Sequence, residues 1–139
     1  MTGYVLGFVF RSNDVLLMCK TKPGWQAGRL NGIGGKIEEG ETPEQAMHRE
    51  FEEEVGGVRV VDWHSFATLL GDNYVCYCYF AFCSSTAKAR ALTEEAVSWY
   101  NVDAVPYSAL PSAKWLIQMA LDSDLSNSGV VADYRTQPL

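Results

Sequence analysis

The segment GGKIEEGETPEQAMHREFEEEVGG (34–57) constrains the fold of this chain most strongly, because both ends of a helix are marked in it. Thr42 is a good N-cap, Pro43 suits the first helical position, and Gln45 completes a capping box. Two glycines close the segment, as they often do at helix ends. The pattern therefore predicts a helix over 42–55 that follows a glycine-rich turn.

The same segment carries eight glutamates in 24 residues, although the whole chain has only 17 acidic residues. On a helical wheel Glu50, Glu53 and Glu54 fall within an arc of about 100°, since spacings of three and four return to one face. An apolar stripe that includes Phe51 and Val55 adjoins them. Like charges beside a buried stripe repel one another and lose solvation, so the cluster needs a counter-charge.

Two explanations of this acidic face stay open from the residues alone. A divalent cation could supply the counter-charge, and all-oxygen ligands favour Mg²⁺ or Mn²⁺. Alternatively, the face is solvated and partnered by Arg49 and Lys36. Glycines at 32, 34, 35 and 40 let the backbone approach a ligand closely. A metal that bridges phosphate oxygens beside such a loop suits phosphoryl or pyrophosphoryl chemistry, which favours the first explanation.

The length and net charge of the chain exclude several further classes of protein. The 139 residues predict a single domain over 1–125 with a polar tail over 126–139. A net charge of −6 argues against broad binding to a nucleic acid polymer or to an anionic membrane, because no excess of basic residues exists. No apolar run approaches the ~18–20 residues that span a bilayer. The start MTGYVLGFVFRSND lacks signal-peptide features and predicts the first strand of a cytoplasmic protein.

Hydrophobic periodicity predicts an α+β fold. Strands are expected over 4–10, 14–20, 58–70, 74–83 and 97–102. A second helix is expected over 113–124, and loops over 21–35 and 85–96. Together these expected strands and helices predict a sheet sandwiched by helices.

Residues 35–57 resemble the Nudix box, G-x5-E-x7-R-E-U-x-E-E-x-G-U, in which U is a bulky apolar residue. The fixed positions are occupied by Gly35, Glu41, Arg49, Glu50, Phe51, Glu53, Glu54 and Gly56. The final U departs from the pattern, because it is Gly57 followed by Val58. The resemblance implies a Nudix α/β/α sandwich with a mixed β-sheet between helices, in which the box forms a loop, a helix and a loop.

The resemblance also implies Mg²⁺-dependent hydrolysis of a nucleoside diphosphate linked to another group, with Mn²⁺ as a possible substitute. Carried over by position, Glu50, Glu53 and Glu54 would hold the metal, with the carbonyl of Gly35 as a further ligand. Three residues would serve the architecture of the box: Arg49, Glu41 and Gly56. The proton acceptor is either Glu50 or a later loop glutamate, for which Glu94 and Glu95 are the candidates; the alternative for that pair is a solvated loop position.

The stretch KTKPGWQAGRLNGIGGKIEEGET is similar to Nudix enzymes that cleave nucleoside triphosphates and act on oxidised purine nucleotides. By that similarity Asn31 contacts the base and Lys20 lies near the pocket, while Gly34 and Lys36 belong to the same substrate-binding stretch. Trp25 either stacks on a base or anchors its loop to the core. The tryptophan and paired acidic residues expected after Pro106 are absent, since the chain has ALPSAKW there.

These features predict an enzyme that converts a nucleoside or deoxynucleoside triphosphate to the monophosphate and pyrophosphate, and so sanitises the nucleotide pool. One alternative is a hydrolase of another nucleoside diphosphate compound, such as ADP-ribose, a nucleotide sugar or a dinucleotide. Another is a Nudix module that senses a nucleotide without cleaving it. The expected partner is a small nucleotide, with no nucleic acid polymer and no membrane, and the expected state is a monomer or a homodimer.

Overall fold

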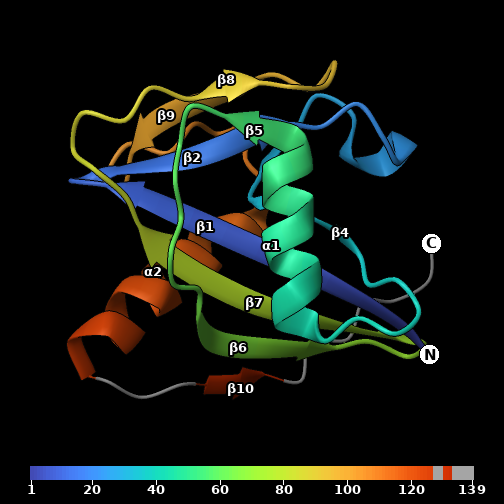
Figure 1. Ribbon diagram of the computed structural model, residues 1–139. Helices are drawn as coiled ribbons and strands as arrows, with labels where there is room; N and C mark the ends of the chain where they lie inside the picture. Colours follow the sequence, from blue (N-terminus) through green and yellow to red (C-terminus); the bar gives the residue numbers. More distant parts are fainter. Residues whose placement is uncertain (127–129, 133–139) are drawn as a thin grey trace.

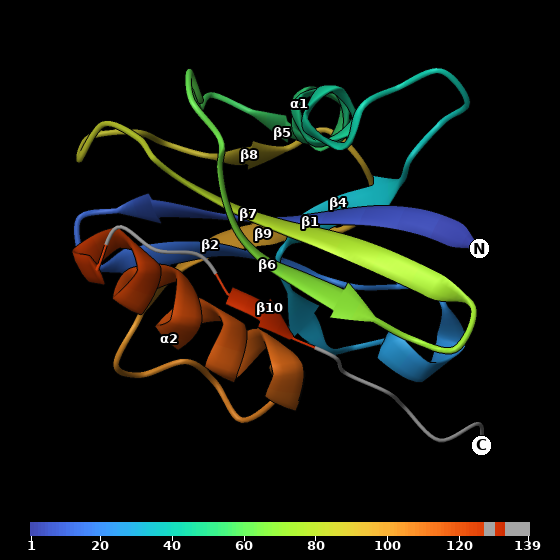
Figure 2. The same ribbon diagram turned by 90° about the horizontal axis from the view of Figure 1, so that it is seen from below.

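The computed structural model describes residues 1–126 and 130–132, and it shows a mixed β-sheet between two helices (Figure 1). Helix α1 (Pro43–Glu54) covers one face and α2 (Pro111–Ser126) covers the other, as Figure 2 shows from below. The predicted α/β/α sandwich is confirmed. Most of the predicted tail lies outside the described residues, apart from the short strand β10 (Val130–Ala132), which pairs in parallel with β6 (His64–Leu70).

Strand β1 (Thr2–Arg11) is the centre of the sheet. One edge pairs in parallel with β7 (Tyr74–Phe82) along almost its whole length. The other edge pairs first with β4 (Ile33–Lys36) and then, near its end, with β2 (Asp14–Cys19) in the predicted hairpin. Strand β1 therefore has two different partners along this edge. The start of the glutamate-rich segment is thereby held against β1.

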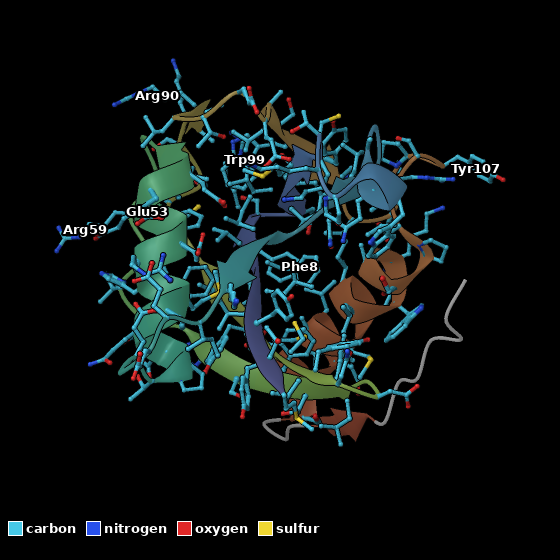
Figure 3. All side chains as sticks on the ribbon, turned by 90° about the vertical axis from the view of Figure 1, so that its right-hand side faces the viewer. Phe8, Glu53, Arg59, Arg90, Trp99 and Tyr107 are labelled. Atoms are coloured by element: carbon cyan, nitrogen blue, oxygen red, sulfur yellow. The ribbon has the colours of Figure 1, made fainter. Side chains whose placement is uncertain are left out.

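Two apolar cores, one on each face of the sheet, follow from the period of two along each strand. Phe8 and Phe10 of β1 point to the α2 side, whereas Val5 and Val9 point to the α1 side. The same alternation occurs in β2, and this explains why both strands are continuous apolar runs. Figure 3 shows Phe8 at the centre of the molecule. Both helices are therefore fixed to one rigid sheet.

The start of α1 forms as the sequence predicts. Thr42 Oγ1 accepts from the Gln45 amide at 3.1 Å, and Gln45 Oε1 accepts from the Thr42 amide at 2.9 Å. The predicted end is wrong by one residue, because the helix stops at Glu54 and Val55 is already extended. Two residues then form β5 (Val55–Gly56), which pairs with β8 (Arg90–Ala91). A distant strand therefore ends the helix.

Other boundaries differ from the predictions where short strands depend on remote partners. The predicted loop 21–35 contains the 3-10 turn η1 (Gly24–Gln26), β3 (Leu30–Asn31) and most of β4. The predicted loop 85–96 contains β8. The strand predicted over 58–70 begins only at residue 64, while β9 (Val97–Asn101) lies where expected and pairs with β2. Helix α2 starts two residues before the prediction, at a proline that suits a first turn.

Within the described part of the chain, no helix is both long enough and apolar enough to cross a membrane.

Candidate active site

The carboxylate face of α1 lies beside its buried stripe, as the wheel predicts. Met47 and Phe51 pack into the core on this side of the sheet. Glu50 and Glu54 are half-buried next to them, and Glu53 is exposed. Figure 3 shows Glu53 on α1, at one side of the molecule. The fold therefore holds two of the three carboxylates in an environment where an uncompensated negative charge is costly.

Arg49 connects three glutamates of the box through hydrogen bonds. Its Nε and Nη2 donate to the two oxygens of Glu41 at 2.7 and 2.9 Å, a bidentate pair. Its Nη1 donates to Glu50 Oε1 at 3.0 Å and to Glu53 Oε2 at 3.3 Å. The predicted ion pair between Arg49 and Glu41 is present, and these hydrogen bonds, with one from the Glu38 amide, lower the pKa of Glu41. Lys36 contributes through its carbonyl, which accepts from Arg49 Nη2 at 3.1 Å.

The glycines before α1 create the space for Glu50. A Cβ at Gly35 would overlap the Glu50 carboxylate, and a Cβ at Gly34 would overlap the backbone of Val5 in β1. Only glycine allows β4 to lie this close to both. Burial raises the pKa of Glu50, although the hydrogen bond and the charge of Arg49 oppose the shift.

Glu54 is the least satisfied carboxylate of the cluster. Its Oε2 is buried and has no hydrogen-bond partner. Burial and the nearby charge of Glu50 raise the pKa of Glu54 to about 7, against the opposing charge of Lys20. The backbone carbonyl of Glu54 accepts from the Leu92 amide at 3.0 Å, so this end of α1 is anchored to the segment that leads to Glu95.

Glu95 is buried, with 7% of its surface exposed, so the solvated position considered for it is wrong; Glu94 is exposed. Glu95 Oε1 accepts from Lys20 Nζ at 3.3 Å, and its Oε2 accepts from the Thr21 amide at 2.6 Å and from Thr21 Oγ1 at 3.2 Å. Burial works to raise the pKa of Glu95, but these hydrogen bonds and the charge of Lys20 lower it overall. No pattern in the sequence pointed to Thr21 as part of this site.

The donor set suits a hard divalent cation. A positive charge placed among these carboxylates would relieve both the unpartnered Oε2 of Glu54 and the burial that raises the pKa of Glu50. As they stand, however, no three Asp, Glu, His or Cys side chains of the described residues are grouped to hold a metal ion. Arg49 contacts one oxygen each of Glu50 and Glu53, so its hydrogen bonds do not engage the second oxygen of either carboxylate.

The remaining predicted substrate residues lie on the loop after β2. Trp25 is 67% exposed at η1, so it does not anchor the loop to the core. It lines a groove between this loop and α2. Asn31 lies in β3, where its Oδ1 accepts from the Gly32 amide at 2.8 Å. Asn31 is not among the residues that line the groove, whereas Arg29 and Lys114, which the sequence did not suggest, are.

The chain is similar to a known protein family and to curated proteins within it. The NUDIX domain family matches residues 2–119. An oxidized purine nucleoside triphosphate hydrolase of Danio rerio is 32% identical over 110 residues, which cover 76% of this chain and 69% of that protein. The 8-oxo-dGTP diphosphatase of Escherichia coli (strain K12) is 47% identical over 45 residues, only 32% of this chain and 35% of that protein.

Among solved structures, the crystal structure of a MutT protein from Bacillus halodurans superposes with a TM-score of 0.76 at 21% identity, covering 99% of this chain and 92% of that chain. At this identity the likeness concerns the fold.

Proposed function

The chain belongs to the Nudix family, and from that premise we propose that it is a Mg²⁺-dependent pyrophosphohydrolase. Its substrate would be a nucleoside or deoxynucleoside triphosphate, and its products the monophosphate and pyrophosphate. The observation that carries the proposal is the buried, unpartnered Oε2 of Glu54 beside Glu50, in a box that departs from the pattern only at Gly57. Such a group persists in a stable fold when a ligand completes it.

The residues that would hold the cation are Glu50, Glu53 and Glu54, with the carbonyl of Gly35 as a further ligand. When bound, Mg²⁺ would lower the pKa of a coordinated water and neutralise charge on the phosphates, and Mn²⁺ could replace it. The protein's own part is to place these oxygens on one rigid helix. Arg49, fixed by Glu41, orients Glu50 and Glu53 through its hydrogen bonds.

Glu50 is the proton acceptor that we favour. The two oxygens of Glu95 are both engaged, by Lys20 and by Thr21, so Glu95 is better suited to fix the loop after β2 than to receive a proton. We therefore propose Glu95 as a positioning residue. Lys20 and Lys36 are proposed to face the substrate phosphates.

The far end of the nucleotide would meet the loop after β2. Trp25 has the exposed indole face that base stacking requires, and Asn31 lies two residues after Arg29, which lines the groove. The curated relatives act on oxidised purine nucleotides by name. We propose the same physiological task for this chain, namely the removal of unwanted nucleotides from the pool.

The proposal is tested by incubating the protein with Mg²⁺ and a panel of nucleoside triphosphates, oxidised purine triphosphates, ADP-ribose, nucleotide sugars and dinucleotides. Release of pyrophosphate and a monophosphate from triphosphates is the expected result. Turnover of ADP-ribose or a nucleotide sugar alone would assign another diphosphate substrate. Nucleotide binding without turnover would identify a sensing module and overturn the proposal.

The proton acceptor is tested separately with pH–rate profiles of Glu50→Gln and Glu95→Gln. We expect the acidic limb of the profile to disappear only in Glu50→Gln. Loss of that limb in Glu95→Gln instead would assign the proton acceptor to Glu95.

A further inference from the structure

Asn31 and Gly32 lie at the junction of two short strands that pair with different partners. Strand β3 ends at Asn31 and pairs with β2, whereas β4 begins one residue after Gly32 and pairs with β1. Gly32 therefore belongs to neither strand. Within the described part of the chain, no backbone carbonyl accepts from the Gly32 amide. This amide is left to bind a side chain.

The side chain that it binds is that of the residue before it. Asn31 Oδ1 accepts from the Gly32 amide at 2.8 Å. Because Oδ1 is bonded directly to Cγ, the hydrogen bond holds the side-chain carbonyl carbon beside the backbone nitrogen of the next residue. A bond between these two atoms would close a five-membered ring. Holding two reacting groups together in this way removes much of the entropic cost of their reaction.

Packing against β1 requires a glycine after Asn31. A Cβ at position 32 would lie 2.7 Å from the carbonyl oxygen of Gly7 and 3.0 Å from the ring of Phe8. Glycine also leaves the backbone nitrogen without the side chain that shields it in other residues. Of the five asparagines in the chain, Asn31 alone is followed by glycine. The fold therefore maintains a pair of residues in which the amide carbon is accessible to the next nitrogen.

We propose that Asn31 is a site of spontaneous deamidation, at which the folded protein converts its own asparagine to aspartate or isoaspartate. The Gly32 nitrogen loses its proton and bonds to Asn31 Cγ, the bond from Cγ to the side-chain nitrogen breaks, and ammonia leaves. Water then opens the cyclic imide at either carbonyl. Asn31 is only half-buried, so water has access to it. The reaction needs no oxidant, no metal and no nucleotide, and the inference is therefore independent of the proposed function.

The products should disturb the junction in two ways. Both add a carboxylate to a chain whose net charge is already −6. Isoaspartate also lengthens the main chain by one carbon. Strand β3 is fixed on its other side, because the Leu30 amide donates to the Ser108 carbonyl at 3.2 Å and the Leu110 amide donates to the Leu30 carbonyl at 3.0 Å. The extra carbon must therefore displace β3 or β4, and we expect the Tm of the isoaspartate form to fall by several degrees.

The experiment is to incubate the folded, full-length protein at mildly alkaline pH and to follow the mass of its tryptic peptides. Residues 30–36 form one such peptide, because Arg29 precedes it and Lys36 ends it. Asn101 is the internal control. Its Oδ1 also accepts at 2.8 Å, but from the amide of Asp103, and a valine follows it. Asn31 should convert at least about tenfold faster than Asn101, a difference of about 1.4 kcal/mol in the barrier. Equal rates at the two positions would overturn the proposal.

The contribution of the fold is measured by repeating the incubation in urea, where the chain is unfolded. If the hydrogen bond between Asn31 and Gly32 promotes the reaction, the folded protein should convert Asn31 at least as fast as the unfolded chain does. A slower conversion in the folded protein would mean that the strands protect Asn31, and it would contradict the inference.

Asn31→Gln supplies a matched variant. Glutamine keeps the amide, but attack by the next nitrogen would have to close a larger ring, so release of ammonia from residues 30–36 should stop. Asn101→Gln should leave that release unchanged. Release that continues in Asn31→Gln would place the reaction elsewhere. If Asn31→Gln does not fold, the comparison of Asn31 with Asn101 in the wild type still decides the question, and neither result bears on triphosphate hydrolysis.

Discussion

The carboxylate face of α1 and the groove between the loop after β2 and helix α2 lie on opposite sides of one sheet and carry opposite charge (Figure 2). The first is acidic and partly buried, and the Oε2 atom of Glu54 there is buried without a hydrogen-bond partner. The second is open, and it is lined by two exposed aromatic rings, Trp25 and Tyr107, and by the cations Arg29 and Lys114. The proposed reaction depends on the first region, so substitutions there should have the largest effects on rate.

The largest expected effect is on the acidic side. Glu53→Gln and Glu54→Gln should each reduce kcat by at least ~10²-fold for every triphosphate, because each removes a proposed metal ligand. Steady-state kinetics with titrated Mg²⁺ would measure it.

Glu52→Gln is the control for this pair. Glu52 lies on the same helix, but it is exposed and pairs with His48 at 3.1 Å. Its kcat should stay near that of the wild type. Equal losses in Glu52→Gln and Glu53→Gln would mean that the helix, and not the metal site, was damaged.

Variants of Arg49 test whether the acidic face depends on the shape of the guanidinium group or only on its positive charge. Arg49→Ala should destabilise the fold by about 2 kcal/mol, because Glu41 and Glu50 lose their shared partner. Arg49→Lys should recover less than half of this loss, since an ammonium lacks the fork that pairs with Glu41 on two atoms. Urea unfolding would measure both. Full recovery in Arg49→Lys would show that charge alone is needed.

Gly57, the position that departs from the box, gives a prediction of similar size for the free energy of unfolding. Gly57 has φ +81° and a Cβ there would overlap the carbonyl of Lys88. Gly57→Val, which restores the usual bulky residue, should therefore destabilise the fold by about 1–3 kcal/mol. Gly40→Val is the control, because Gly40 has φ +85° but open space around its Cβ. If the two variants lose equal stability, the contact with Lys88 is unimportant.

The smallest expected effect concerns Glu95, which binds Lys20 and Thr21 at the start of the loop after β2. The pKa of Glu95 is lowered in the folded state, so its ion pair stabilises the protein fully above the unfolded value of about 4.3. That contribution is lost as the pH falls through the folded pKa. Glu95→Gln should therefore cost about 1 kcal/mol at pH 7 and less near pH 3. Chemical unfolding at both values would measure it, and a cost that grows toward pH 3 would contradict the assignment.

The acidic region could be predicted because its information is local. The capping box, the arc of glutamates and the pair between Arg49 and Glu41 all lie within one helix and the turn before it, where spacing fixes which side chains meet. The wheel could not show that Arg49 also binds Glu50 and Glu53, since rotamers decide that. The burial of Glu95 could not be predicted from the sequence either, because its partners Thr21 and Lys20 are more than 70 residues away.

By itself, the sequence determined the helix, its carboxylate face, the two-faced sheet and the family. Each of these follows from periodicity, or from a motif within a short stretch of chain. Only the tertiary structure decided where α1 ends, which carboxylate is left without a partner, and that Arg29, Tyr107 and Lys114 line one groove. The physical reason is that burial and pairing between distant segments depend on how the sheet brings them together, and no local spacing encodes that.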